Sequence, residues 1–168
     1  VVLAFAQFLG KRLLELPKLG CFNIHTSLLP KYRGAAPIQY ALLNGDKTSG
    51  VSIQKMVKKM DAGDLGHSFE LPLRETETGG QLYTRLKFQA ALSLNDFIYE
   101  LLDGSASFTA QDEGNISFAP TLKREDGYLD FKNSKMANIH NRVRALFPWP
   151  GTYCTLNNKR LKVFTVEP

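Results

Sequence analysis

The residues best suited to chemistry in this chain are an asparagine and a histidine two positions apart, Asn23 and His25, in the stretch CFNIHTSLLPKYRGAAP. They lie at the carboxyl end of a short apolar run that is typical of a buried strand. A polar pair on such a strand is costly unless it is hydrogen-bonded or used. An imidazole can move a proton near neutral pH, and an amide NH2 can donate to a developing oxyanion. The pair therefore indicates a candidate catalytic site.

A carboxylate that could join this pair is Asp61, in the stretch KKMDAGDL. It follows the third predicted strand, beside an Ala-Gly pair that is typical of a tight turn. Close to His25 it would orient the imidazole ring, and the three residues together suit acyl transfer to an amine. The chain contains no G-x-S-x-G motif to supply a serine nucleophile. On spacing alone, Asn23 and His25 could equally be a structural hydrogen-bonded pair, and Asp64 is an alternative to Asp61.

Strands and helices alternate along the part of the chain that must position these residues. Apolar runs and alternation predict strands over 1–5, 21–25, 50–57 and 66–73. Helical spacing predicts helices over 9–16, 37–43 and 79–103, the last begun by a capping box of Thr78 and Gln81 and ended by Gly104. This order predicts an α/β fold. The segment Ser27–Pro30 is expected to form a rigid wall with free backbone groups.

The C-terminal third has a different pattern. Residues 104–128 are rich in Gly, Ser, Asp and Thr, which predicts a loop or interdomain linker. Ser134 is expected to cap a helix, and a hairpin is expected over 152–156 and 159–166 across Asn157-Asn158. One apolar face is expected on that helix, formed by Met136, Ile139, Val143 and Leu146. The sequence thus predicts one domain over 1–118, then a linker and the beginning of a second domain over 119–168.

Composition restricts the class of protein. The chain has 168 residues, 43% of them hydrophobic and 11% aromatic, which argues against a disordered chain. The longest apolar stretch, at the N-terminus, is about half of the roughly 20 residues that a membrane-spanning helix needs. The two cysteines lie far apart, so neither a disulfide framework nor a zinc knuckle is expected. No metal site and no membrane partner are predicted, and a cytoplasmic location is the simplest expectation.

Charge is unevenly distributed along the chain. The net charge is +5, with basic residues in excess at both ends and acidic residues in excess between them. Two basic surfaces would suit a polyanionic partner, although solvated faces explain the same pattern. The basic residues of the C-terminal third that could contact phosphates are Lys123, Arg124, Arg142, Arg144, Lys159, Arg160 and Lys162.

The stretch NIHTSLLPKYRGAAPIQYALLNGDKTSGVSIQKMVKKMDAGD resembles the signature region of the tetrahydrofolate-dependent formyltransferases. Within that family, the RGAAPIQ run and the segments APTLKREDGYLDF and HNRVRALFPWPGTY most resemble the members that act on methionyl-tRNA. The resemblance covers essentially the whole chain. At Thr26, relatives often carry Gly or Pro, so the local loop geometry is expected to differ.

The resemblance implies a fold and a reaction. The fold is a Rossmann-like formyltransferase core, incomplete at its N-terminal side, followed by a linker and the start of a small β-barrel of the oligonucleotide-binding type. The reaction moves the formyl group of 10-formyltetrahydrofolate to the amino group of methionine on initiator methionyl-tRNA, by a monomer in the cytoplasm or an organellar matrix. The chain, which has no initiator Met, is expected to be an internal fragment of such an enzyme.

The resemblance also assigns roles to particular residues. The catalytic Asn, His and Asp of the family fall on Asn23, His25 and Asp61, and the folate-contacting loop falls on Ser27, Leu28, Leu29 and Pro30.

Other acceptors and one other class remain open. A nucleotide-linked amino sugar or glycinamide ribonucleotide would use the same chemistry, and the segment 123–166 argues against the second because such enzymes usually lack a barrel domain. A hydrolase of formyl-folate is a further alternative. A tRNA-binding module without activity is the alternative from another class, and the intact Asn23, His25 and Asp61 argue against it.

Overall fold

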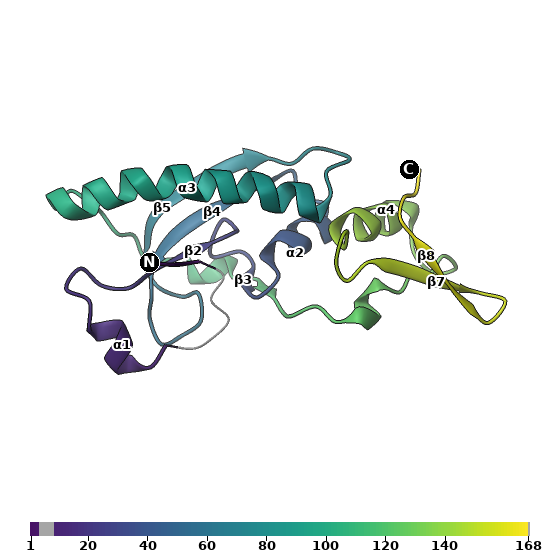
Figure 1. Ribbon diagram of the computed structural model, residues 1–168, viewed down its shortest axis with the longest axis horizontal. Coiled ribbons are helices and arrows are strands. Elements are labelled where there is room, and N and C mark those ends of the chain that lie inside the picture. The colour runs from purple at the N-terminus through teal and green to yellow at the C-terminus, as the bar shows by residue number, and fades with distance from the viewer. Residues whose placement is uncertain (4–8, 168) are drawn as a thin grey trace.

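A four-stranded mixed sheet forms the centre of the protein, in a computed structural model that describes residues 1–3 and 9–167 (Figure 1). Its order is β1-β2-β4-β5. The strands are β1 (Val2–Leu3), β2 (Phe22–His25), β4 (Thr48–Lys55) and β5 (Leu65–Pro72). Strand β1 runs parallel to β2, whereas β4 is antiparallel to both β2 and β5. Together with the helices described below, the sheet confirms the predicted α/β class, in the form of a mixed sheet.

Two helices cover one face of this sheet. Helix α2 (Pro37–Leu43) and helix α3 (Gly79–Asp103) pack on β4, and Figure 1 shows α3 running along β4 and β5. Both helices have the predicted bounds. Thr78 and Gln81 form the predicted capping box, and Gly104 ends α3 with a φ of 82°, where glycine carries no Cβ penalty. The core beneath them contains Phe22, Ile24, Ile38, Leu42, Val51, Ile53, Leu82, Leu86, Ala90, Phe97 and Ala145.

The opposite face of the sheet is polar at the end of β2. In the β2–β4 register Asn23 lies opposite Gln54, and His25 lies opposite Ser52. Successive strand residues alternate between faces, so these four side chains point away from the apolar core. The predicted division of β2 into an apolar and a polar side is confirmed, because Phe22 is 3% exposed within that core.

The segment 104–128 is more structured than the sequence predicts. It contains the 3-10 helices η1 (Glu113–Asn115) and η2 (Arg124–Gly127) and the strand β6 (Phe118–Ala119). Strand β6 pairs in parallel with β3 (Arg33–Gly34), inside the stretch expected to be a loop. Gly34 permits this pairing, since its φ is 124° and a Cβ there would lie 2.6 Å from the carbonyl oxygen of Ala119. The segment therefore folds back onto the first part of the chain.

The C-terminal part contains α4 (Met136–Ala145) and a hairpin of β7 (Thr152–Leu156) and β8 (Lys159–Val163). Asn157 and Asn158 have φ values of 48° and 60°, as the predicted two-residue turn requires. The predicted Ser134 cap is wrong, because the helix begins after Lys135 and has no side-chain cap. Among residues 1–3 and 9–167 strands β7 and β8 form a sheet of their own and no barrel, so the structure does not show the expected barrel.

The junction between α3 and α4 is held by buried charged groups. The Glu77 carboxylate accepts two hydrogen bonds from Arg85 Nη1, at 2.8 and 2.7 Å, and its side chain is 1% exposed. Arg144 Nη1 donates to the carbonyl oxygens of Arg74 and Glu77 at 3.3 and 3.4 Å. Burial lowers the pKa of Arg144, whereas the charges of Glu77 and Glu75 raise it. The expectation that Arg144 lies on the helix surface is wrong, because its guanidinium satisfies carbonyls at the junction.

The N-terminal elements are shorter than predicted. Strand β1 covers Val2–Leu3, and the rest of the predicted strand, residues 4 and 5, lies outside the described residues. Val1 and Leu3 are 61% and 47% exposed, because β1 stands at the edge of the sheet. Helix α1 (Lys11–Glu15) has no buried residue. In the described part of the chain, every helix is too short or too polar to cross a bilayer.

Candidate active site

The structure brings Asn23, His25 and Asp61 together at the carboxyl end of β2. Asn23 Nδ2 donates to Asp61 Oδ1 at 3.4 Å, and His25 Nδ1 lies 3.8 Å from Asp61 Oδ2. His25 Nε2 donates to the carbonyl oxygen of Tyr32 at 2.8 Å. Both ring nitrogens therefore face oxygen atoms, and an imidazolium has an N–H donor for each of them. His25 is 6% exposed, so its ring is held in a desolvated setting.

Asp61 occupies the turn between β4 and β5. Its φ is 49°, in the left-handed region that Asp tolerates better than most residues. Two groups hold its carboxylate: the Gly34 N–H donates to Oδ2 at 2.9 Å, and Gln54 Nε2 donates to Oδ1 at 2.9 Å. The alternative carboxylate, Asp64, is exposed, and its backbone carbonyl accepts from the Lys55 N–H at 2.8 Å. The carboxylate that faces His25 is thus that of Asp61.

Gln54, Gln111 and Arg33 also belong to this cluster, and the sequence did not indicate them. Gln54 is 2% exposed, and its Oε1 accepts from the Gly63 N–H at 3.3 Å. Gln111 comes from the segment expected to be a loop or linker, and Arg33 comes from β3, a strand that the sequence did not predict. For Gln54 a signal existed, since it is a polar residue inside a buried strand. For Gln111 there was none, because it comes from a segment whose composition predicts a loop.

The segment Ser27–Pro30 follows β2 directly and is tied to the sheet. Ser52 Oγ donates to the Ser27 carbonyl at 2.8 Å and accepts from the Leu29 N–H at 3.0 Å. Ser27 Oγ donates to the Lys31 carbonyl at 2.6 Å. Ser27 and Leu29 are buried, whereas Leu28 and Pro30 are half-buried. The segment is held in place as expected, but these bonds occupy the Ser27 carbonyl and the Leu29 N–H, which the sequence led us to expect free.

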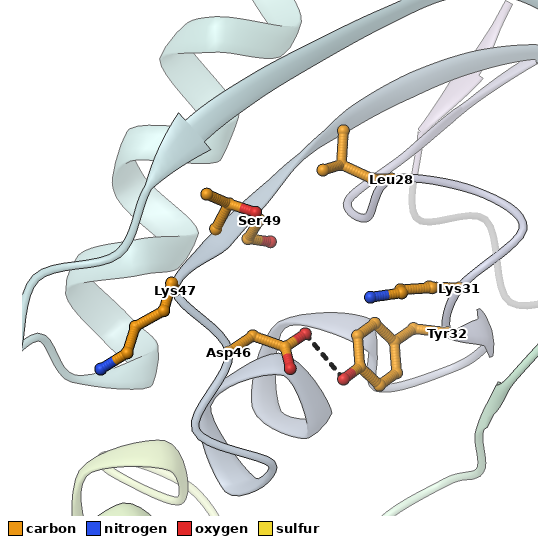
Figure 2. Close-up of a pocket in the computed structure, with 7 residues that line it drawn as sticks. Leu28, Lys31, Tyr32, Asp46, Lys47 and Ser49 are labelled. Atoms are coloured by element: carbon orange, nitrogen blue, oxygen red, sulfur yellow. Dashed lines mark hydrogen bonds between the residues drawn. The ribbon is translucent and has the colours of Figure 1, made fainter.

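A cavity of about 140 Å³ lies beside this segment, and Figure 2 shows most of its lining side chains. The Tyr32 hydroxyl donates to Asp46 Oδ2 at 2.8 Å and accepts from Asn44 Nδ2 at 2.9 Å. Burial raises the pKa of Tyr32 to about 12, an effect that the Asn44 bond opposes and Asp46 reinforces. The cavity is lined by Leu28, Lys31, Tyr32, Asp46, Lys47, Thr48 and Ser49. It therefore adjoins the Ser27–Pro30 segment without including Asn23, His25 or Asp61.

His67 plays a structural part. Its Nε2 lies 2.7 Å from Glu100 Oε2, and its ring packs against Phe97 with centroids 5.6 Å apart. Within the described ranges, His, Cys, Asp and Glu form no cluster of three or more that could hold a metal ion. The acid–base groups at the end of β2 are consequently the ones whose arrangement suits chemistry.

Comparison with known proteins places the chain in a family. Residues 1–97 match the family described as Formyl transferase, and residues 121–168 match Formyl transferase, C-terminal domain. The chain belongs to the formyl transferase family. Residues 98–120, which include Gln111, lie between the two matched segments.

Curated relatives of the chain include bacterial methionyl-tRNA formyltransferases. The enzyme of Bacillus licheniformis is 43% identical over 168 residues, which cover 99% of this chain and 52% of that protein. The enzyme of Bacillus subtilis is 42% identical over 164 residues, which cover 98% of this chain and 51% of that protein. The chain therefore spans about half the length of the curated relatives it matches.

Solved structures of formyltransferases share the fold. The N-formyltransferase of Helicobacter canadensis, in complex with folinic acid and dTDP-3-aminofucose, superposes with a TM-score of 0.74 at 23% identity, over 85% of this chain and 52% of that one. The sugar 3N-formyl transferase WlaRD, with dTDP and 5-N-formyl-THF present, gives 0.72 at 26% identity over the same shares. The family uses folate donors, and both of these structures hold a folate compound.

Proposed function

We propose that the protein transfers the formyl group of 10-formyltetrahydrofolate to the amino group of methionine on initiator methionyl-tRNA. The observation that carries the proposal is the convergence of Asn23, His25 and Asp61 at the end of β2. Identity above 40% to methionyl-tRNA formyltransferases over nearly the whole chain supports the acceptor. The methionine amine attacks the formyl carbon, and the carbonyl oxygen becomes a tetrahedral oxyanion.

Asn23 and His25 act on that oxyanion in the proposed mechanism. The Asn23 amide and the protonated His25 ring donate hydrogen bonds to it, and losing one such donor raises a barrier by ~2.7–4 kcal/mol. Donation by His25 requires its ring to turn a nitrogen from its present oxygen partner toward the substrate. Asp61 orients that ring and accepts the amine proton, directly or through a water molecule. The intermediate collapses when that proton passes to the folate nitrogen, the bond between this nitrogen and the formyl carbon breaks, and the carbonyl forms again.

The substrates are assigned to two surfaces. Ser27, Leu28, Leu29 and Pro30 would border the folate, and since Ser27 and Leu29 are buried, contact falls to Leu28, Pro30 and backbone atoms. The tRNA phosphates would lie on the basic residues of the C-terminal part, which we expect to begin an oligonucleotide-binding barrel. The basic side chains that are exposed and could contact phosphates are Lys123, Arg124, Lys159, Arg160 and Lys162. Arg144 is buried in the α3–α4 junction.

A formyl-transfer assay on the chain in its natural full length tests the proposal. It offers 10-formyltetrahydrofolate with methionyl-tRNA, a nucleotide-linked amino sugar or glycinamide ribonucleotide as acceptor. We expect transfer to methionyl-tRNA, reduced at least about 100-fold in His25→Ala, in the range usual for loss of a general acid–base group. Near-normal turnover of His25→Ala would make the residue assignment wrong. Binding of tRNA without any transfer would favour a binding module.

A nucleotide-linked amino sugar is the second candidate acceptor. The observation that favours it is the superposition on sugar N-formyltransferases with TM-scores of 0.72 and 0.74. Both have lower sequence identity than the methionyl-tRNA formyltransferases, at 26% and 23%. Transfer to the amino sugar alone would keep the roles of Asn23, His25 and Asp61 and replace the acceptor.

A further inference from the structure

Arg33 carries a charge that is buried beside the candidate active site. The residue is 1% exposed, and its Nε and Nη2 donate to Gln111 Oε1 at 3.1 and 2.7 Å. Its Nη2 also reaches Glu113 Oε1, at 3.1 Å, on a side chain that is 62% exposed. Within the described residues its Nη1 has no hydrogen-bond partner. Burial of an incompletely paired charge is unfavourable, so this arrangement is expected where the charge serves a function.

Gln111 connects that charge to the turn that presents Asp61. Its Oε1 is held by Arg33, and its NH2 group donates to the carbonyl oxygens of Asp61 and Gly63, at 2.9 and 2.7 Å. A hydrogen bond from a guanidinium to the amide oxygen polarises the amide, which strengthens the NH2 group as a donor. Gln111 thus binds both ends of the turn 61–63 at once.

This turn needs external support because Asp61 is in the left-handed conformation. Its carboxylate is supported separately, by Gln54 Nε2 and by the Gly34 N–H. Gly34 directly follows Arg33 in β3, so the guanidinium and the amide act from the same short strand. The backbone of the turn and carboxylate oxygen Oδ2 are therefore both linked to β3, the backbone through Gln111 and Arg33 and the oxygen through the Gly34 N–H.

We propose that Gln111, anchored by Arg33, is a positioning residue that fixes the turn 61–63 so that the Asp61 carboxylate stays beside His25. The catalytic consequence rests on the proposed formyl transfer, whereas the positioning itself does not. A segment that matches neither family region, residues 98–120, would then be part of the active site.

Three variants of the natural full-length chain test the catalytic consequence. Gln111→Met removes donor and acceptor at similar size, whereas Gln111→Glu keeps an acceptor for Arg33 and removes the NH2 donor. The matched control, Glu113→Gln, removes the negative charge of the exposed partner of Arg33 and leaves Gln111 in place. We expect kcat to fall at least about tenfold in both Gln111 variants, with the folate KM within about twofold, because misplaced catalytic groups lower turnover more than binding. In Glu113→Gln we expect kcat within about twofold. Unchanged kcat in both Gln111 variants would overturn the proposal.

Amide hydrogen exchange tests the positioning without any activity. The Gly34 N–H donates to Asp61 Oδ2, while the Ala36 N–H nearby donates to the Ala119 carbonyl at 3.1 Å and serves as the internal control. In both Gln111 variants we expect Gly34 to exchange at least about tenfold faster and Ala36 to keep its rate. Unchanged Gly34 exchange, or equal acceleration at Ala36, would contradict the proposal.

If the unaltered chain transfers no formyl group, the proposed function fails, and the exchange measurement still decides whether Gln111 positions the turn. If Gln111→Met does not fold, Gln111→Glu alone decides.

Discussion

Two buried polar clusters in this protein are built in different ways. In the cluster at the end of β2, the key separations are long: 3.8 Å from His25 Nδ1 to Asp61 Oδ2, and 3.4 Å from Asn23 Nδ2 to Asp61 Oδ1. At the α3–α4 junction, the Glu77 carboxylate lies 2.7 and 2.8 Å from Arg85 Nη1. The Glu77–Arg85 pair is thus a close, charge-assisted contact, whereas the contacts that join Asn23 and His25 to Asp61 are longer, although the Gly34 N–H and Gln54 Nε2 hold Asp61 itself at 2.9 Å.

The difference agrees with different tasks. Charge-assisted hydrogen bonds at short distance stabilise a fold, so the Glu77–Arg85 pair fixes the start of α3, where Arg144 of α4 donates to the carbonyl oxygens of Arg74 and Glu77. Gly79 has the same effect, because a Cβ there would lie 2.4 Å from the Ala145 carbonyl oxygen. Groups that act on a substrate can be incompletely paired in the free protein, since catalytic hydrogen bonds often shorten only in the complex. Substitutions in the first cluster should therefore change turnover, and those in the second should change stability.

The largest expected effect is that of Asp61→Asn on turnover. Asparagine keeps the shape of the side chain and one acceptor oxygen but loses the charge that orients His25. We expect kcat for formyl transfer to fall at least about 100-fold, within the range typical of acid–base groups. The free energy of unfolding should fall by only about 1 kcal/mol, for one lost acceptor. Steady-state transfer and urea denaturation measure the two quantities. A variant with half the original turnover would remove the contrast between the clusters.

Glu77→Gln should have the opposite profile. Loss of the buried carboxylate charge leaves Arg85 without its ion-pair partner and removes one of the two acidic charges that act on Arg144. We therefore expect the free energy of unfolding to fall by about 2–3 kcal/mol. Folded molecules should keep kcat within about twofold, because Glu77 touches none of the catalytic candidates. Glu75→Gln is the matched control, since that carboxylate is exposed nearby and its loss should change stability by less than about 0.5 kcal/mol. Equal effects of the two substitutions on urea denaturation would argue against a stabilising role for the junction.

The parts of the fold that the sequence predicts well are those with strong local signals. Helix α3 has a capping box, a long apolar periodicity and a terminal glycine, and its bounds are as predicted. The β7–β8 hairpin has its Asn-Asn turn. Strands β3 and β6 have two residues each, too short for any periodicity, and only their pairing defines them. A short pairing across 85 residues of sequence leaves no local pattern to detect.

The candidate site divides in the same way. Asn23 and His25 stand out because polar residues interrupt a buried strand, and Asp61 stands out at the following turn. Arg33 and Gln111 matter only through their contact with each other, 78 positions apart. Arg144 was misplaced for a related reason, since a charged helix residue is normally solvated and only the carbonyls at the α3–α4 junction make its burial favourable. Tertiary contacts, which one sequence does not display, decide all three.

The smallest expected effect lies at the first residue before α3, next to Glu77. Thr78 Oγ1 accepts from the Gln81 N–H at 3.3 Å, so Thr78→Ala removes a helix cap and should lower the free energy of unfolding by about 1 kcal/mol. Thr84→Ala, inside the same helix, is the control. Its hydroxyl donates to the Gly80 carbonyl, which is already a helix acceptor, and alanine has the higher helix propensity, so stability should stay or rise slightly. Urea denaturation separates them. Equal free energies of unfolding for the two variants would show that the charges at the junction, and not the cap, fix the start of α3. A loss of turnover in Thr78→Ala would show that the junction is coupled to the candidate active site.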